Sequence, residues 1–204
     1  YPPPKYDLII EPFAGSAQYA FTYADHRVIL IEKNEAVVRL WKWLQKAKSK
    51  DILKLPLFDP KDEIKYHIPE ARDLIAMSMN PGTTPPGRNF AGSFANLRLG
   101  WYRKRAKIAN NLDKIRHWDI RLGDYRDIRN QSATWFIDPP YQGKPRNYNR
   151  FRIENENYTV LADWCKSRKG QVIVCDLVGA DWLPFSLLHK SPMSQTNRIQ
   201  NEAI

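Results

Sequence analysis

Cysteine is scarce in this sequence, histidine is scattered, and no long apolar segment is present. The two cysteines, Cys165 and Cys175, lie ten positions apart, without a CxxC pattern or neighbouring histidines. They indicate reduced core thiols, and neither a disulfide framework nor a metal site is expected. No apolar run approaches the roughly 20 residues of a membrane-spanning helix, so no membrane partner is expected. Reduced thiols favour a cytoplasmic protein. Residues 1–5 do not resemble a signal peptide, and the missing initiator methionine indicates a fragment or a processed product.

Positive charge is abundant and unevenly distributed. The formal net charge is +10, and between Arg88 and Arg129 eleven Lys and Arg residues stand against four Asp and Glu. Clustered positive charge suggests a phosphate backbone as partner, although a solvated basic surface gives the same pattern. With 204 residues, 43% of them hydrophobic, the chain is long enough for one full core that carries an insert.

The most informative stretch is a short apolar run, 133–137, that ends at Asp138-Pro139-Pro140-Tyr141. The run predicts a buried strand, and α/β proteins bind ligands at the carboxyl ends of such strands. Each proline fixes its own φ and restricts the residue before it, so the Asp138 carboxylate and the Pro139 carbonyl project from a stiff loop. Two acceptors beside the Tyr141 ring suit a flat base that bears an amino group. A strand end followed by a simple turn is the alternative interpretation.

A second stretch lies near the start, where an apolar strand over 6–10 precedes Glu11-Pro12-Phe13-Ala14-Gly15-Ser16. We expect a helix from about Ser16 to Ala24, with Ser16 as its N-cap. A strand, a small-residue turn and a helix together direct backbone N–H groups towards an anion. Gly15 has no Cβ, so it allows the backbone to approach a ligand closely.

The next strand, 28–31, ends on Glu32. An acidic residue at this position commonly binds ribose hydroxyls in nucleotide-binding α/β folds; capping the following helix is the alternative role. That helix is predicted over 35–48, with apolar residues at helical spacing and lysines near its end.

The α/β alternation stops over 51–96, where Pro- and Gly-rich loops flank a short helix near 69–79. A long helix is predicted over 96–118, apolar on one face and basic elsewhere. Its basic residues, suited to a phosphate backbone, are Arg98, Arg103, Lys104, Arg105 and Lys107. In the loop before it, Arg88 and Asn89 have side chains of the types that reach guanine and adenine edges, or they only buttress the fold.

The alternation resumes with a strand near 119–122, and a helix over 158–166 and a strand over 170–176 follow. Residues 185–188 and 202–204 are expected to form an antiparallel edge hairpin. The loop 142–157 either closes over a substrate or is simply solvated. The sequence therefore predicts a Rossmann-like α/β sheet with helices on both faces. Residues 1–50 and 119–204 would form the catalytic domain, and 51–118 an inserted recognition segment of helices and loops.

The order of these motifs resembles the S-adenosylmethionine-dependent N6-adenine DNA methyltransferases of the Dam-like class. The resemblance runs from Asp7 to about Asp176 and is specific at the two loops. It implies a site-specific bacterial or phage enzyme that methylates adenine in double-stranded DNA, with a cognate restriction endonuclease as a further partner. Relatives carry a Gly-Lys segment ahead of the first loop, for which residues 1–5 leave no room. Either the chain begins after that segment, or it binds the cofactor more weakly.

The resemblance also implies a role for each matching residue. The catalytic residues would be Asp138, Pro139, Pro140 and Tyr141. The S-adenosylmethionine site would comprise Glu11, Pro12, Phe13, Ala14, Gly15, Ser16, Glu32, Lys33, Asp124, Tyr125 and Asp138, with Asp124 at the position that contacts the cofactor adenine. The nucleic-acid contacts would be Arg88, Asn89, Arg98, Arg103, Lys104, Arg105 and Lys107.

The chemistry follows from the acceptors at the catalytic loop. An adenine amino nitrogen is a poor nucleophile because its lone pair is delocalised into the ring. Asp138 and the Pro139 carbonyl, accepting from its two N–H bonds, would favour a tetrahedral nitrogen that attacks the methyl group directly. The base must first be flipped out of the duplex and would stack on Tyr141. Alternative functions are RNA adenine methylation, N4-cytosine methylation, or nucleic-acid binding without catalysis.

Overall fold

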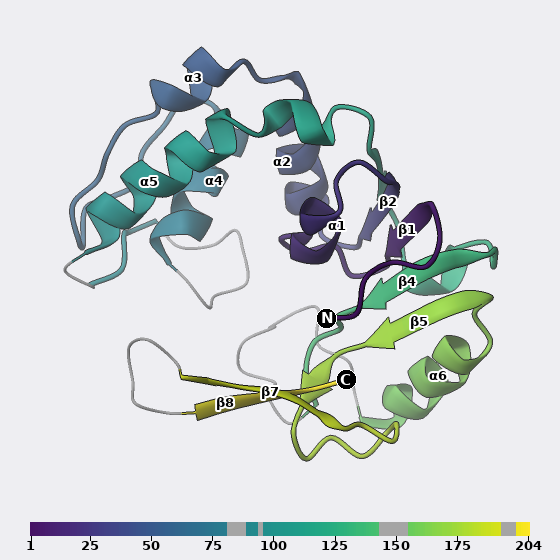
Figure 1. Ribbon diagram of the computed structural model, residues 1–204. Helices are drawn as coiled ribbons and strands as arrows, with labels where there is room; N and C mark the ends of the chain where they lie inside the picture. The colour runs from purple at the N-terminus through teal and green to yellow at the C-terminus, as the bar shows by residue number, and fades with distance from the viewer. Residues whose placement is uncertain (81–88, 94–95, 143–154, 193–198) are drawn as a thin grey trace. The chain divides into compact units, whose positions relative to one another are not determined.

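The computed structural model describes residues 1–80, 89–93, 96–142, 155–192 and 199–204 (Figure 1). It is an α/β structure built on a five-stranded parallel sheet with helices flanking it, which confirms the predicted α/β class and is compatible with a Rossmann-like fold. The strand order is β3-β2-β1-β4-β5. The strands are β1 (Leu8–Glu11), β2 (Arg27–Glu32), β3 (Asp119–Leu122), β4 (Ala133–Ile137) and β5 (Gly170–Val174).

The central strands are apolar on both faces, as strands covered on both sides must be. Ile10 lies opposite Trp135 in the β1–β4 register, and both pack in a core cluster with Leu161 of helix α6 (Asn155–Lys166). Phe136, the next residue of β4, points to the other face, where its ring stacks on Tyr19 of helix α1 (Gln18–Thr22) at 4.4 Å between centroids. The alternation along β4 therefore places one helix on each face.

Helix α1 begins later than predicted. The residue before it, Ala17, has a left-handed φ of 47° and makes no side-chain cap, so the expectation that Ser16 caps the helix is wrong. Gly15 has a positive φ as well, 44°. Because a right-handed helix cannot include such residues, the tight turn extends through Ala17 and the helix begins at Gln18.

The middle of the chain contains α2 (Glu35–Lys46), α3 (Ser49–Leu53), α4 (Pro69–Met79), α5 (Leu97–Ala109) and the 3-10 turn η1 (Leu112–Ile115). The single long helix predicted over 96–118 is therefore wrong, since α5 ends at Ala109. The Asn111 side chain explains the break, because its Nδ2 donates to the Lys107 carbonyl (2.8 Å) in competition with helical bonding. A second short 3-10 turn, η2 (Tyr125–Asp127), follows β3.

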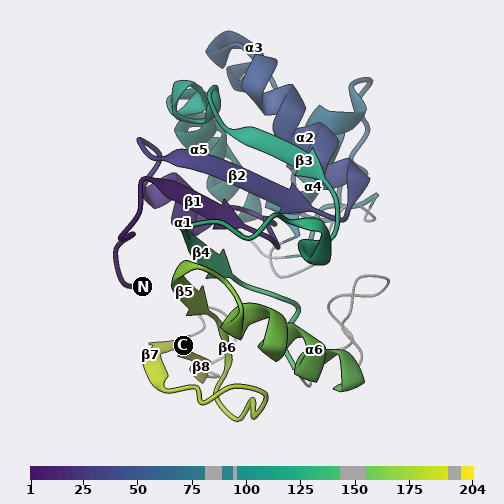
Figure 2. The ribbon, with the colours of Figure 1, turned by 90° about the vertical axis from the view of Figure 1, so that its right-hand side faces the viewer.

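The C-terminal part adds a second sheet rather than an edge to the first. The short strand β6 (Asp176–Leu177) pairs with β8 (Ile199–Ala203), which also pairs with β7 (Leu187–Pro192), all antiparallel. The predicted hairpin is thus confirmed, but it lies in a three-stranded sheet of order β6-β8-β7 (Figure 2). Across the described residues, none of the helices has the length and apolar character needed to cross a membrane.

Contacts divide the chain into two compact units. The first unit comprises Tyr1–Lys33 and Gly123–Ile204, and the second comprises Asn34–Leu122. Both motifs singled out in the sequence, the 11–16 turn and the 138–141 loop, belong to the first unit. The predicted recognition segment, 51–118, falls within the second.

Candidate active site

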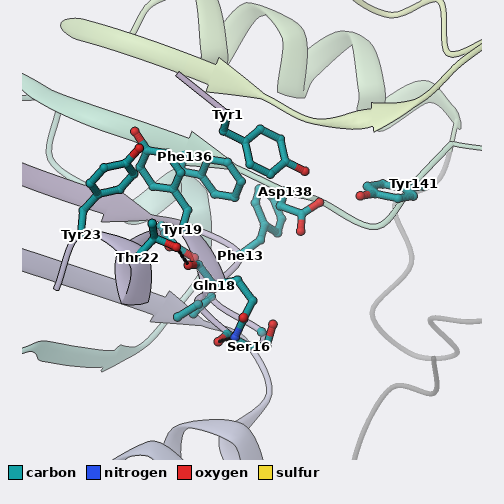
Figure 3. Close-up of a pocket in the computed structure, with 14 residues that line it drawn as sticks. Tyr1, Phe13, Ser16, Gln18, Tyr19, Thr22, Tyr23, Phe136, Asp138 and Tyr141 are labelled. Atoms are coloured by element: carbon teal, nitrogen blue, oxygen red, sulfur yellow. Dashed lines mark hydrogen bonds between the residues drawn. The ribbon is translucent and has the colours of Figure 1, made fainter. Parts of the chain in front are cut away.

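A cavity of about 520 Å³ lies in the first unit where β1 and β4 end. These neighbouring strands are the point at which the strand order reverses direction, and open α/β sheets bind ligands at this position. Figure 3 shows Tyr19, Tyr23 and Phe136 towards one end of the cavity, with Asp138 and Tyr141 towards the other. The lining residues are Tyr1, Glu11, Phe13, Ala14, Gly15, Ser16, Ala17, Gln18, Tyr19, Thr22, Tyr23, Phe136, Asp138 and Tyr141.

The cavity joins the two loops that the sequence separates by more than a hundred residues. Of the predicted cofactor residues, Glu11, Phe13, Ala14, Gly15, Ser16 and Asp138 line it. Of the predicted catalytic residues, Asp138 and Tyr141 line it, whereas Pro139 is buried and Pro140 half-buried. Pro12 is also buried and lies outside the lining.

The Phe13–Ala17 turn, which follows β1, is anchored by backbone and side-chain hydrogen bonds. The Ala14 N–H donates to the Ile31 carbonyl (3.0 Å), and the Gly15 N–H donates to Glu32 Oε2 (3.1 Å). A Cβ added at Gly15 would meet no atom within 4 Å, so this part of the backbone faces open space. The turn therefore presents a bare main chain to whatever occupies the cavity.

Glu32 thus holds the turn, and the helix-capping role considered for it is not observed. The N-cap of α2 is Asn34, whose Oδ1 accepts the Ala36 N–H (3.1 Å). Glu32 does not line the cavity, but its carboxylate is fixed one hydrogen bond away from a lining residue.

Glu11 is the buried acid of the site. Its side chain is 2% exposed, and its Oε1 accepts the Ala20 N–H at 2.6 Å. Burial raises the pKa of Glu11 to about 8, and the nearby Asp138 charge adds to the shift, while the Ala20 hydrogen bond opposes it. The cavity therefore contains two carboxyl groups in different environments, one enclosed and one, Asp138, exposed.

Asp124, Lys33 and Tyr125 do not line the cavity. Asp124 forms ion pairs with Arg126 (2.8 Å) and Lys33 (3.0 Å). The hydrogen bond from Arg126 is the main cause that lowers the pKa of Asp124, and Lys33 contributes to the same effect. The Tyr125 ring packs on Phe13 with 5.3 Å between centroids, so this group supports the turn through Phe13.

The predicted nucleic-acid residues fall in the second unit and divide into three kinds. Arg88 lies outside the described residues. Three have partners within the unit: Asn89 Oδ1 accepts from Arg72 (2.6 Å), Arg98 pairs with Asp59 (2.8 Å), and Arg105 donates to the Leu55 carbonyl. The remaining three, Arg103, Lys104 and Lys107, are exposed on α5.

Several residues that line the cavity lie outside the two motifs and were not predicted as site residues. Tyr19, Tyr23 and Phe136 line the cavity, and the Tyr19 and Phe136 rings are parallel within 4°. The signal available for Phe136 was the alternation of β4, which points every second side chain to the α1 face. For Tyr19 and Tyr23 the spacing of four residues placed them on one helix face, but not facing a ligand.

The chain matches no model of a known protein family, and no curated protein matches it significantly.

Proposed function

We propose that this chain is an S-adenosylmethionine-dependent DNA methyltransferase that modifies the N6 amino group of a flipped adenine. The observation that carries the proposal is the shared cavity, which is lined both by the Phe13–Ala17 turn and by Asp138 and Tyr141. Two stretches that resemble motifs of one enzyme class, distant in sequence, lie at a single site at the strand-order switch point.

The lining suits the proposed cofactor. The cavity volume falls within the range of about 300–1,000 Å³ typical of small-molecule sites, and six of the fourteen lining residues are aromatic. Gly15 allows close approach of a ligand, while the exposed Asp138 carboxylate favours a cationic ligand. Bound S-adenosylmethionine would supply a methyl group from its positive sulfonium, with the S–CH3 bond breaking to leave a neutral thioether. The methylated nitrogen would then lose one proton to solvent.

The catalytic roles belong to the loop after β4. The Asp138 carboxylate would accept one N–H bond of the adenine amino group, and the Pro139 carbonyl would accept the other. Both contacts would orient the nitrogen lone pair towards the methyl donor, which is catalysis by positioning of the reacting groups. Tyr141, half-buried in the lining, would stack on the base after it leaves the duplex.

A nucleic-acid substrate is supported by charge. The net charge is +10, and Arg103, Lys104 and Lys107 are exposed on one helix of the second unit. Exposed cations of this kind bind phosphates irrespective of sequence, so they do not distinguish DNA from RNA.

The test is methyl transfer from labelled S-adenosylmethionine to DNA and RNA of the same sequence, followed by nucleoside analysis. We expect N6-methyladenine in the DNA. Label in RNA alone would replace DNA by RNA as the substrate, and label on cytosine would change the target base. Nucleic-acid binding without any transfer would indicate a non-catalytic binding protein.

A further inference from the structure

The Asp138–Tyr141 loop has few backbone N–H groups that could form hydrogen bonds to hold its conformation. Pro139 and Pro140 have no N–H group, so two consecutive donors are missing from the loop. The Pro140 carbonyl and the Gln142 N–H group instead bind side chains from other elements.

The first of these side chains is Tyr158 of α6. Its hydroxyl donates to the Pro140 carbonyl at 2.6 Å, and its ring is 3% exposed in the core. The phenol therefore reaches the loop from the helix that covers the opposite face of the sheet from α1. Because the ring is enclosed, the position of its hydroxyl is well defined.

The second side chain is Asp176 at the start of β6. The β4–β5 register places Val174 opposite Ile137, and the Cys175 N–H donates to the Ile137 carbonyl (2.9 Å). Asp176 consequently lies beside the point where β4 passes into the loop. It is fully buried, and its Oδ2 accepts the Gln142 N–H at 3.4 Å.

A tryptophan links the two anchors. Trp182 donates its indole N–H to the same Asp176 Oδ2 (2.7 Å), and its ring packs against the Tyr158 ring with 5.5 Å between centroids. The Gln142 side chain adds two hydrogen bonds to Asp181, one to its Oδ1 (3.0 Å) and one from its N–H (3.2 Å). The contacts thus connect Pro140 to Gln142 through the side chains of Tyr158, Trp182 and Asp176.

Burial of the Asp176 carboxyl group costs solvation free energy. Burial raises the pKa of Asp176, while the hydrogen bonds from Trp182, Leu177 and Gln142 oppose that shift. An enclosed carboxyl group destabilises the fold unless its oxygens accept hydrogen bonds. The Asp176 oxygens accept three: one from the Gln142 N–H of the loop, one from Trp182, which packs on Tyr158, and one from the Leu177 N–H.

We infer that Asp176 and Tyr158 are positioning residues, which fix the backbone of residues 140–142 and so hold the Asp138 carboxylate in the cavity in the geometry needed for methyl transfer. The inference rests on the proposed function for its kinetic consequence. Its structural half, the anchoring of the loop, is measurable without any activity. Neither residue lines the cavity, so both act through the loop.

The kinetic test uses Tyr158→Phe, which removes one oxygen and keeps the buried ring, and Asp176→Ala with Asp176→Asn as the conservative variant. Each of the first two should lower kcat by about 10- to 100-fold, the loss expected from misplacing a reacting group by roughly 1 Å. KM for S-adenosylmethionine should change less than about twofold, since the Phe13–Ala17 turn is untouched. Asp176→Asn should recover part of kcat, because its amide oxygen still accepts one of the donors.

Thr134→Val is the matched control. Thr134 is fully buried on β4, the strand that leads into the loop. Its hydroxyl accepts the Lys5 N–H (3.1 Å) and donates to Gln171 (2.9 Å), remote from the loop. The Thr134→Val variant should have a lower free energy of unfolding without a comparable loss of kcat. An equal loss of kcat in Thr134→Val, or a kcat within twofold of the parent in Tyr158→Phe, would overturn the inference.

Hydrogen exchange separates the inference from the proposed function. A peptide of residues 138–142 reports only the amides of Tyr141 and Gln142, because both prolines lack one and Asp138 becomes the amino terminus. Exchange in this peptide should be faster in Tyr158→Phe and Asp176→Ala than in the parent and in Thr134→Val. If the parent transfers no methyl group, the proposed function fails, and faster exchange still supports the anchoring. Unchanged exchange in both variants refutes the anchoring, whatever the activity.

Discussion

Replacing Gly15 by alanine separates the conformational role of this residue from its role at the ligand. Its φ of 44° is left-handed, and an added Cβ would meet no protein atom within 4 Å. The cost to folding is therefore backbone strain alone, about 1–2 kcal/mol of unfolding free energy. The new methyl group would project into the open space at the cavity, where it would displace a ligand that approaches the main chain. We expect S-adenosylmethionine affinity to fall at least about tenfold, equivalent to roughly 1.4 kcal/mol.

Gly179→Ala is the matched control for this experiment. Gly179 also has a positive φ, 100°, and no atom within 4 Å of a built Cβ, and it does not line the cavity. Chemical denaturation of both variants should show destabilisation, whereas calorimetric titration should show weakened cofactor binding in Gly15→Ala alone. Unchanged affinity in Gly15→Ala, or an equal loss in both variants, would refute the proposed approach of the cofactor to the turn.

Three further predictions address the acids of the site and the basic helix. Glu32→Ala removes the acceptor of the Gly15 N–H, so cofactor affinity measured by calorimetry should fall; retained affinity would argue against a role for Glu32 at this site. The pKa of Glu11 is raised from 4.5 to about 8, so its contribution to folding stability is fully present below pH 4.5 and is lost as the pH rises to about 8. Unfolding free energies measured across this range should show Glu11→Gln gaining stability relative to the parent as the pH rises; a constant difference would contradict the shift. Neutralising Arg103, Lys104 or Lys107 should weaken binding to all duplexes alike and reduce the salt slope by about one unit, and an unaltered slope in all three would exclude α5 from the interface.

The strands and the two loops could be predicted because their signals are local. Each apolar run that ends in a turn sequence, such as 133–137 before Asp138, predicts a strand and its carboxyl end without knowledge of the remaining chain. The parallel arrangement of β1 and β4 then brings their ends to one edge. The meeting of the turn and the loop at one cavity follows from that topology.

The elements that were predicted wrongly depend on interactions that a local pattern does not contain. Ser16 has the right residue type for an N-cap, but the left-handed conformation of Ala17 moves the helix start beyond it. The periodicity over 96–118 is helical, yet Asn111 bonds the Lys107 carbonyl and ends the helix. The C-terminal hairpin pairs with β6 rather than with the main sheet, a choice of partner that strand patterns do not specify.

The supporting contacts of the site were beyond prediction for the same reason. Asp124 pairs with Lys33, 91 positions earlier, and the Tyr158 hydroxyl reaches Pro140 from another element. A buried carboxyl such as Asp176 is recognisable only after its donors are known. Residue type and spacing indicate which groups do chemistry, while the groups that hold them in place emerge only from the tertiary structure.

The most direct measurement of the central claim is the transfer of a trideuterated methyl group to duplex DNA by the parent protein and by Asp138→Ala. Asp138 lines the cavity and is exposed, so its removal should leave folding nearly unchanged, and a saturating concentration of S-adenosylmethionine compensates for weaker cofactor binding. After digestion to nucleosides, mass spectrometry should find trideuteromethyl-N6-deoxyadenosine with the parent and none above background with the variant. Equal label with both proteins would contradict the assignment of Asp138, and the absence of labelled deoxyadenosine with the parent would contradict the proposed DNA adenine activity itself.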